Sequence, residues 1–235
     1  MTPKEYERAR RLLMRRDPVL REAIKKIGPC RMADRQRRDH LTALVGAIVS
    51  QQLSTKAAAT IFGRFTALLE TGTGVNASTR TPVPMTAAAI DGVSDAQLRG
   101  VGFSGQKVGY LRDLCARIAD GRLNLEELEA LEDELVIERL TSVKGFGRWT
   151  AEMFLMFRLH RPDVLPAGDL GIVNAIHRLY GMRKRPKADR ILKMGEAWRP
   201  YRSVASWYLW QTLRNEPLAT TARSRPRSRA TSRAR

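Results

Sequence analysis

The sequence of 235 residues lacks the residues that define several common protein classes. Its two cysteines, Cys30 and Cys115, are too few and too far apart for a disulfide framework or a cysteine metal site. Its three histidines show no metal-ligand spacing, which argues against zinc. No apolar run approaches the roughly 20 residues that cross a bilayer, and the charged N-terminus lacks the apolar core of a signal peptide. A cytoplasmic protein without a membrane partner is expected.

Acidic residues are scarce relative to basic ones. Lys and Arg number 42 against 24 Asp and Glu, which gives a net charge of +18. Residues 219–235 hold six Arg and no acid, so the remainder still carries +12. Such an excess favours nucleic acid as partner over an anionic membrane surface. The last residues, 218–235, have too little apolar content to pack, and they are predicted to form a disordered basic tail.

Alternating apolar and polar residues, which would indicate strands, are also lacking, and helical periodicity takes their place. Asp17 can cap a helix that has Pro18 at its first position and stops at Gly28. Ser94 and Gln97 form a capping-box pattern. The fold class is therefore predicted to be all-α. Helices are expected over residues 17–28, 40–52, 55–70, 105–121, about 126–142, 148–159, 170–180, 187–197 and 200–214, with an exposed connection over 71–86.

A short stretch, "VKGFGRWTA" at residues 143–151, predicts a helix, a tight turn and a second helix. Gly145 and Gly147 bracket the turn, and without Cβ atoms they permit positive φ and close approach of another backbone. The second helix then begins with free N–H groups at the positive end of its dipole, which suit a phosphate. Lys144 and Arg148 strengthen that interpretation. A plain helix junction could use the same glycines, so the motif alone does not decide.

Several motifs in order resemble one family. "VKGFGRWTAEM", "DVLPAGDLGI" and "RPYRSVASWYLW", with "DPVLREAIKKIGP", "IVSQQLSTKAA" and "LRGVGFSGQKVGYLRDL", are similar to the helix-hairpin-helix, Gly/Pro, Asp superfamily of DNA glycosylases. Within it they resemble the AlkA-type branch, 3-methyladenine DNA glycosylase II, over about residues 17–214.

The resemblance implies two helical domains with a DNA cleft between them. Residues 1–28 and 163–217 would form one domain, and residues 34–160 the other, with the helix-hairpin-helix at about 133–159. Larger AlkA-type enzymes carry an N-terminal β domain that is not expected here, which implies a more open base pocket.

The resemblance also assigns the chemistry. Asp169 would stabilise the positive charge that develops on the sugar when the base leaves. Its place before a predicted helix also fits a mere N-cap, and Asp163 is the nearest competitor. Trp149 stands where the strand-cutting branch has a nucleophilic Lys, which implies a monofunctional enzyme that uses water.

Further site residues follow from the same resemblance. Trp149, Met153 and Trp210 would line the base pocket, while Tyr201 is undecided. Leu53 would be the wedge that fills the gap left by the flipped nucleotide, although it could instead be a hydrophobic staple ahead of a Ser54 cap. No cofactor is expected beyond Na⁺ or K⁺ on the main-chain carbonyls of Thr141, Val143 and Gly145. The expected DNA contacts are Gln52, Leu53, Ser54, Lys144, Gly145, Gly147, Arg148 and Thr150.

The sequence therefore predicts a monomeric, monofunctional glycosylase that acts on alkylated purines, of the 3-methyladenine and 7-methylguanine type, in double-stranded DNA. Two alternatives stay open. A glycosylase specific for mismatches or other lesions would keep the aspartate and change the pocket. A non-catalytic helix-hairpin-helix DNA-binding protein would explain the charge and the glycines, but not the aspartate with its two tryptophans.

Overall fold

The computed structural model describes residues 1–32, 39–72 and 85–214, and the predicted basic tail lies outside these ranges. Over these ranges the chain forms helices and contains no β-strand, which confirms the predicted all-α class. The same residues include no helix long and apolar enough to cross a membrane.

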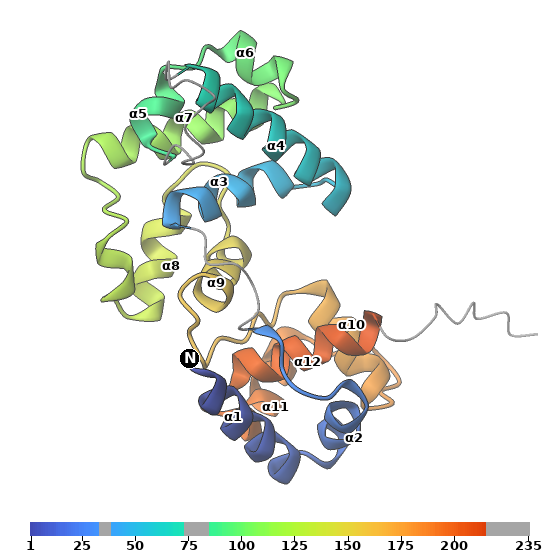
Figure 1. The fold of residues 1–235 in the computed structure, drawn as a ribbon. Helices are drawn as coiled ribbons and strands as arrows, with labels where there is room; N and C mark the ends of the chain where they lie inside the picture. The colour runs from blue at the N-terminus through green and yellow to red at the C-terminus, as the bar shows by residue number, and fades with distance from the viewer. Residues whose placement is uncertain (33–38, 73–84, 215–235) are drawn as a thin grey trace, which may run out of the picture.

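One group of helices is formed by the N-terminal and C-terminal parts of the chain together. Figure 1 shows it below the rest of the molecule, and the packing contacts agree. Its members are α1 (Pro3–Arg16), α2 (Pro18–Ile27), α10 (Leu170–Leu179), α11 (Ala188–Gly195), the 3-10 turn Glu196–Trp198 and α12 (Arg202–Arg214).

The middle of the chain forms the second group. Within it α7 packs against α3, α5 and α6, and α9 packs against α3 and α8. In Figure 1, α9 lies at the side that faces the terminal group. Its members are α3 (His40–Ser50), α4 (Thr55–Gly72), α5 (Ala87–Asp91), α6 (Asp95–Gly100), α7 (Gly105–Ala119), the 3-10 turn Glu127–Glu129, α8 (Asp133–Thr141) and α9 (Arg148–Phe157).

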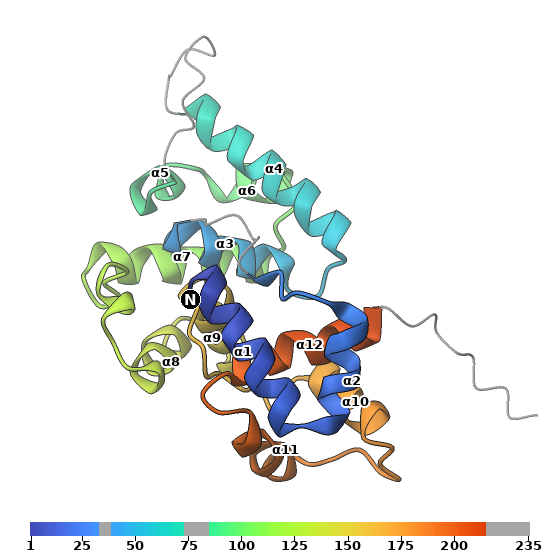
Figure 2. The ribbon, with the colours of Figure 1, turned by 60° about the horizontal axis from the view of Figure 1, so that its bottom comes forward.

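Helix α1 is missing from the helices expected from the sequence, although its signals are present. Thr2 and Glu5 form a capping box, and Pro3 occupies the first helical position. Tyr6 and Leu13 are buried on one side of the helix. Figure 2 shows α1 in front, beside α2. The many charged residues of this segment lie on its exposed side. Among them, the short apolar stripe that indicates a helix was not recognised in the sequence.

The prediction of a single helix at about 126–142 is also wrong. The structure has a 3-10 turn at Glu127–Glu129 and then α8, which begins at Asp133. Arg161 donates from Nη2 to the carbonyls of Glu129 and Leu131, at 2.8 and 2.7 Å. These carbonyls point out toward the guanidinium, which favours a break because a continuous helix would use them internally.

A buried carboxylate holds the terminal group together. Asp17 caps α2 by accepting from the N–H groups of Val19 and Leu20 at 3.0 and 2.9 Å. Its other oxygen accepts from the Tyr180 hydroxyl at 2.5 Å and from the Trp198 indole at 2.8 Å. Burial, followed by the hydrogen bond to Asp17, raises the pKa of Tyr180 and keeps its hydroxyl a donor. One side chain thus ties α2 to segments more than 160 positions away.

We expect Asp17→Ala to lower the free energy of unfolding by about 3 kcal/mol. The change removes a helix cap, worth about 1 kcal/mol, and leaves the Tyr180 and Trp198 donors without their shared acceptor. Urea unfolding measures the difference. Asp39→Ala is the matched control, because Asp39 caps α3 at an exposed position and should cost only about 1 kcal/mol. Equal losses for the two variants would contradict the role given to Asp17.

Candidate functional site

The Asp169 carboxylate lies between two indoles. It caps α10, and its Oδ1 accepts from the Ile172 N–H at 2.8 Å. The same oxygen accepts from Trp210 Nε1 at 2.8 Å, and Oδ2 accepts from Trp149 Nε1 at 2.8 Å. The three donors come from α9, α10 and α12. The structure therefore brings together three of the side chains singled out from the sequence, and the cap that was the alternative interpretation is present at the same time.

Gly171 makes this arrangement possible. A Cβ atom at this position would lie 2.9 Å from Asp169 Oδ1 and 2.9 Å from Trp210 Cδ1. Any side chain here would push the carboxylate and the indole apart. Gly171 was not among the site residues predicted from the sequence. Its signal was available, because a glycine in the first turn of a helix weakens the helix and so indicates a close approach by other atoms.

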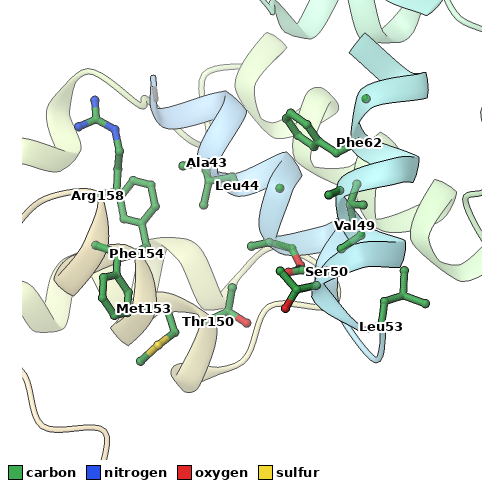
Figure 3. Close-up of a pocket in the computed structure, with 17 residues that line it drawn as sticks. Ala43, Leu44, Val49, Ser50, Leu53, Phe62, Thr150, Met153, Phe154 and Arg158 are labelled. Atoms are coloured by element: carbon green, nitrogen blue, oxygen red, sulfur yellow. The ribbon is translucent and has the colours of Figure 1, made fainter. Parts of the chain in front are cut away.

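Helix α9 connects the aspartate to an apolar groove. Trp149, Met153 and Phe157 are spaced by four along α9 and so share one side of it. Trp149 is 52% exposed, and the ring of Phe157 stacks at a tilt on Trp210 with centroids 5.9 Å apart. Met153 and Phe157 also line a groove of about 700 Å³ between α9, α3 and α4. Figure 3 shows this groove, with Met153 and Thr150 on α9 and Leu53 at its other end.

The turn between α8 and α9 uses its two glycines differently. Gly145 has φ +82°, and a Cβ atom there would lie 2.3 Å from the Tyr110 ring. Gly147 has φ −100°, and a Cβ atom would meet nothing within 4 Å. The positive φ that a glycine permits is therefore used at Gly145 and not at Gly147. Because Gly147 caps α9 without a side chain, it leaves open space beside the N–H groups of Arg148 and Trp149.

The charged side chains around this turn are partly neutralised. Arg148 contacts Glu134 at 2.6 Å and Glu152 at 3.2 Å, and the hydrogen bond to Glu134 raises the pKa of the guanidinium. Lys144 is exposed, with Nζ 4.0 Å from Asp113. Thr150 is buried, and its N–H already donates to the Gly147 carbonyl at 2.9 Å. Of these three candidates for DNA contact, Lys144 has the side chain most open to solvent.

The loop between α3 and α4 presents an apolar side chain. Gln52 has φ +58°, and the Leu53 side chain that follows is 39% exposed. Ser54 Oγ accepts from the Ala57 N–H at 3.3 Å and so caps α4. Leu53 and Ala58 line the same groove, as a hydrophobic staple requires, while the exposed part of Leu53 is free to act as a wedge.

Two further candidates stay predictions. Tyr201 lies just before α12, nine positions from Trp210, so about 13 Å of helix separates their backbones. The Val143 carbonyl accepts from the Phe146 N–H at 3.1 Å, and the Gly145 carbonyl accepts from Gln51 Nε2 at 2.9 Å. Each of these two oxygens keeps a second lone pair.

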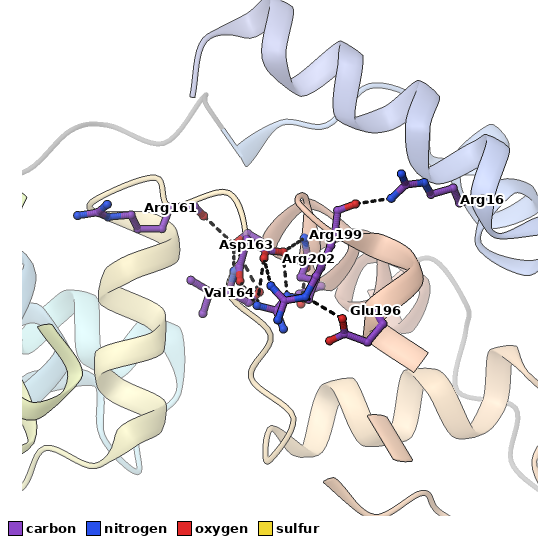
Figure 4. A network of polar contacts seen from close by, with 9 residues as sticks. Arg16, Arg161, Asp163, Val164, Glu196, Arg199 and Arg202 are labelled. Atoms are coloured by element: carbon purple, nitrogen blue, oxygen red, sulfur yellow. Dashed lines mark hydrogen bonds and ion pairs between the residues drawn. The ribbon is translucent and has the colours of Figure 1, made fainter. Parts of the chain in front are cut away.

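Asp163, the competing carboxylate, is held in a structural network (Figure 4). It accepts from Arg199 Nη1 at 2.6 Å and from Arg202 Nε at 2.8 Å. Arg202 also donates to the Asp163 carbonyl at 2.7 Å. Nearby, Ser203 accepts from the Val164 N–H at 2.9 Å. This network fastens the segment before Asp169 to the start of α12, and it gives Asp163 a structural role.

The sequence and the fold of this chain match a family of known proteins. A family model described as "HhH-GPD superfamily base excision DNA repair protein" matches residues 45–200. The chain is 38% identical over 178 residues to DNA-3-methyladenine glycosylase 1 of Schizosaccharomyces pombe, which covers 75% of this chain and 74% of that protein.

Solved structures agree. S. pombe 3-methyladenine DNA glycosylase (Mag1), in complex with abasic DNA, has a TM-score of 0.73 at 35% identity and covers 88% of this chain and 97% of its own. DNA-3-methyladenine glycosidase of Bacillus halodurans has a TM-score of 0.70 at 36% identity and covers 86% of each chain. The chain belongs to the HhH-GPD superfamily of base excision DNA repair proteins, which confirms the resemblance seen in its motifs.

The two glycines of the turn should respond differently to the same substitution. Gly145→Ala should lower the free energy of unfolding by about 2–4 kcal/mol, because it combines left-handed backbone strain with overpacking against Tyr110. Gly147→Ala should change it by less than about 0.5 kcal/mol, since its space is open. Urea unfolding of both variants makes the comparison, and a loss at Gly147 as large as that at Gly145 would contradict the geometry.

Proposed function

We propose that this protein is a monofunctional DNA glycosylase that hydrolyses the N-glycosidic bond of alkylated purines, of the 3-methyladenine and 7-methylguanine type, after flipping them from the duplex. The observation that carries the proposal is the Asp169 carboxylate held between the Trp149 and Trp210 indoles. The names of the similar glycosylases support the choice of substrate. We propose further that it acts as a cytoplasmic monomer on double-stranded DNA, without a membrane partner.

The carboxylate suits the charge that the reaction develops. Breaking the bond between the sugar and the base leaves positive charge on the sugar ring, as in other glycoside hydrolysis. A preorganised anion stabilises that charge without reorganising at the moment of reaction. The two oxygens of Asp169 accept three hydrogen bonds, whereas an ionised carboxylate has about four acceptor positions. The remaining position, on Oδ2, can orient an attacking water.

The indoles offer a surface for the flipped base. Trp149 is 52% exposed beside the carboxylate, and Trp210 is backed by the Phe157 ring. A purine alkylated on a ring nitrogen is cationic, and a cation is attracted to the electron-rich face of an indole. Met153 extends this side of α9 with an adaptable apolar side chain. These contacts favour a cationic purine over a neutral base of the same shape.

The grip on DNA uses the main chain. The N–H groups of Arg148 and Trp149 point from the start of α9 into open space at Gly147, where a phosphate can approach. Such contacts carry no base information, so they serve damaged and undamaged DNA alike. The neutral carbonyl oxygens of Thr141, Val143 and Gly145 fit a monovalent cation such as Na⁺ or K⁺, which would add positive charge beside the same phosphate. No other cofactor is proposed.

Asp169→Asn tests the catalytic assignment. Asparagine can still cap α10, but it removes the charge, so release of 7-methylguanine from a methylated duplex should fall by about 10²–10³-fold. Binding to the same duplex should change little, because the phosphate contacts are untouched. Free base released in a single turnover is the measurement. Asp39→Asn, at the cap of α3, is the matched control and should keep full activity. Near-normal release by Asp169→Asn would remove Asp169 from the mechanism.

The product is expected to be an intact strand with an abasic site. Strand cleavage by a lyase needs an amine beside the sugar that forms a Schiff base, and here the indole of Trp149 faces Asp169 instead. Borohydride added during turnover should therefore trap no protein–DNA adduct, and strands should break only after alkali. An adduct that disappears on replacing a single lysine would establish a lyase and overturn the monofunctional proposal.

A further inference from the structure

Lys107 binds the end of helix α3 from the neighbouring helix. Its ammonium donates to the carbonyls of Val49 and Gln51, at 2.8 and 2.7 Å. The last carbonyls of a helix have no partner within it, and the dipole makes them attract a cation. Lys107 itself stands in the first turn of α7, where that helix's own dipole disfavours a cation. Its position is therefore explained by the carbonyls of α3 rather than by α7.

These bonds fix the turn that exposes Leu53. The Gln51 carbonyl belongs to the peptide group that leads into Gln52, whose φ of +58° is unusual for a residue with a side chain. The N–H of Leu53 returns to the Ser50 carbonyl at 3.2 Å. A left-handed residue costs about 1 kcal/mol or more and persists only where its surroundings hold it. Lys107 is the charged group that holds this peptide.

The same side of α7 also contacts the turn between α8 and α9, which is the hairpin of the helix-hairpin-helix. Tyr110 lies one turn after Lys107, and its ring fills the space beside Gly145. Asp113 lies a further turn on and accepts from the Lys144 N–H at 2.9 Å. Burial favours a higher pKa for Asp113, but this bond and the Arg117 guanidinium bring the pKa below its ordinary value. Residues three apart lie on one side of a helix, so a single stripe of α7 contacts both loops.

A direct hydrogen bond also connects the α3–α4 loop to the hairpin. Gln51 Nε2 donates to the Gly145 carbonyl at 2.9 Å, which joins the α3–α4 loop to the hairpin without passing through α7. Gln51 thus meets Lys107 with its carbonyl and the hairpin with its side chain. The apolar tip at Leu53 and the N–H groups at the start of α9 are held at one fixed separation.

We propose that Lys107 is a positioning residue. It couples insertion of the Leu53 side chain into the DNA to phosphate binding by the hairpin between α8 and α9, and Gln51 links the two loops. The inference rests on the proposed function, because it takes Leu53 as the wedge and the hairpin as the grip. Without the Lys107 ammonium the hairpin still binds phosphate through α9, but Leu53 is no longer presented at the right place. Base flipping suffers, and non-specific binding does not.

Lys107→Met tests this, because methionine keeps most of the apolar stem and removes the ammonium. Single-turnover release of 7-methylguanine is measured at saturating protein on two duplexes, one with the lesion paired to cytosine and one with it opposite an abasic site. The rate should fall by about tenfold or more on the paired duplex and by less than about threefold on the unpaired one, where flipping is already easy. Affinity for undamaged DNA should stay unchanged.

Three companion variants sharpen the result. Lys107→Arg keeps a cation that can reach both carbonyls and should restore most of the rate. Lys56→Met removes the same charge from an exposed position near the loop and should leave the ratio between the two duplexes as in the wild type. Leu53→Ala should reproduce the pattern of Lys107→Met, and the double variant should be little worse than either, since both remove one function.

The possible outcomes distinguish a failure of the proposed function from a failure of the role proposed for Lys107. If the wild-type protein releases no base from either duplex, the proposed function fails. If the wild type is active and Lys107→Met slows both duplexes equally, or neither, Lys107 does not position the wedge and the inference is overturned. Should Lys107→Met unfold on thermal denaturation, Gln51→Leu breaks the link to the Gly145 carbonyl and must show the same preference for the unpaired duplex.

Discussion

The structure depends on one carboxylate that three helices hold in place. Asp169 receives hydrogen bonds from the start of its own helix, from Trp149 on α9 and from Trp210 on α12. The two groups of helices meet at this point, because α9 belongs to one and α10 and α12 to the other. Gly171 is required for the same reason, since any Cβ atom there would occupy the space of the carboxylate and the indole. Fixed donors of this kind keep an anion preorganised, which is what stabilisation of a developing cation needs.

The remainder of the terminal group positions that carboxylate. Asp17 ties α2 to Tyr180 and Trp198, and Asp163 ties the segment before Asp169 to Arg199 and Arg202. Each carboxylate accepts from several donors, Asp17 at a buried position and Asp163 at a partly buried one. Three aspartates thus share a residue type but differ in task. Asp17 also has aromatic partners, so what distinguishes Asp169 is that its two indole partners lie beside an apolar groove.

Helix α7 has a comparable place in the other group. It contributes no side chain to the carboxylate site, yet Lys107, Tyr110 and Asp113 contact the two loops that face DNA in the proposed function. Main-chain groups make a phosphate site only when their geometry is fixed, because they have no side chain with which to adapt. A rigid helix that holds both loops supplies that geometry.

The sequence by itself determined the all-α class, the family and most helix starts, because caps, glycines and apolar periodicity are local signals. It pointed to Asp169, Trp149 and Trp210 through motif resemblance, since their spacing of 20 and 41 positions has no local meaning. Helix α1 and the break before α8 were missed, the first because its many charged residues obscured the apolar stripe and the second because Arg161 acts from 30 positions away.

Only the tertiary structure decided that Gly145 and Gly147 differ, that Arg148 is paired with Glu134, and that Lys107 reaches the end of α3. Each of these depends on atoms brought together from distant segments, and no local pattern encodes such a distance.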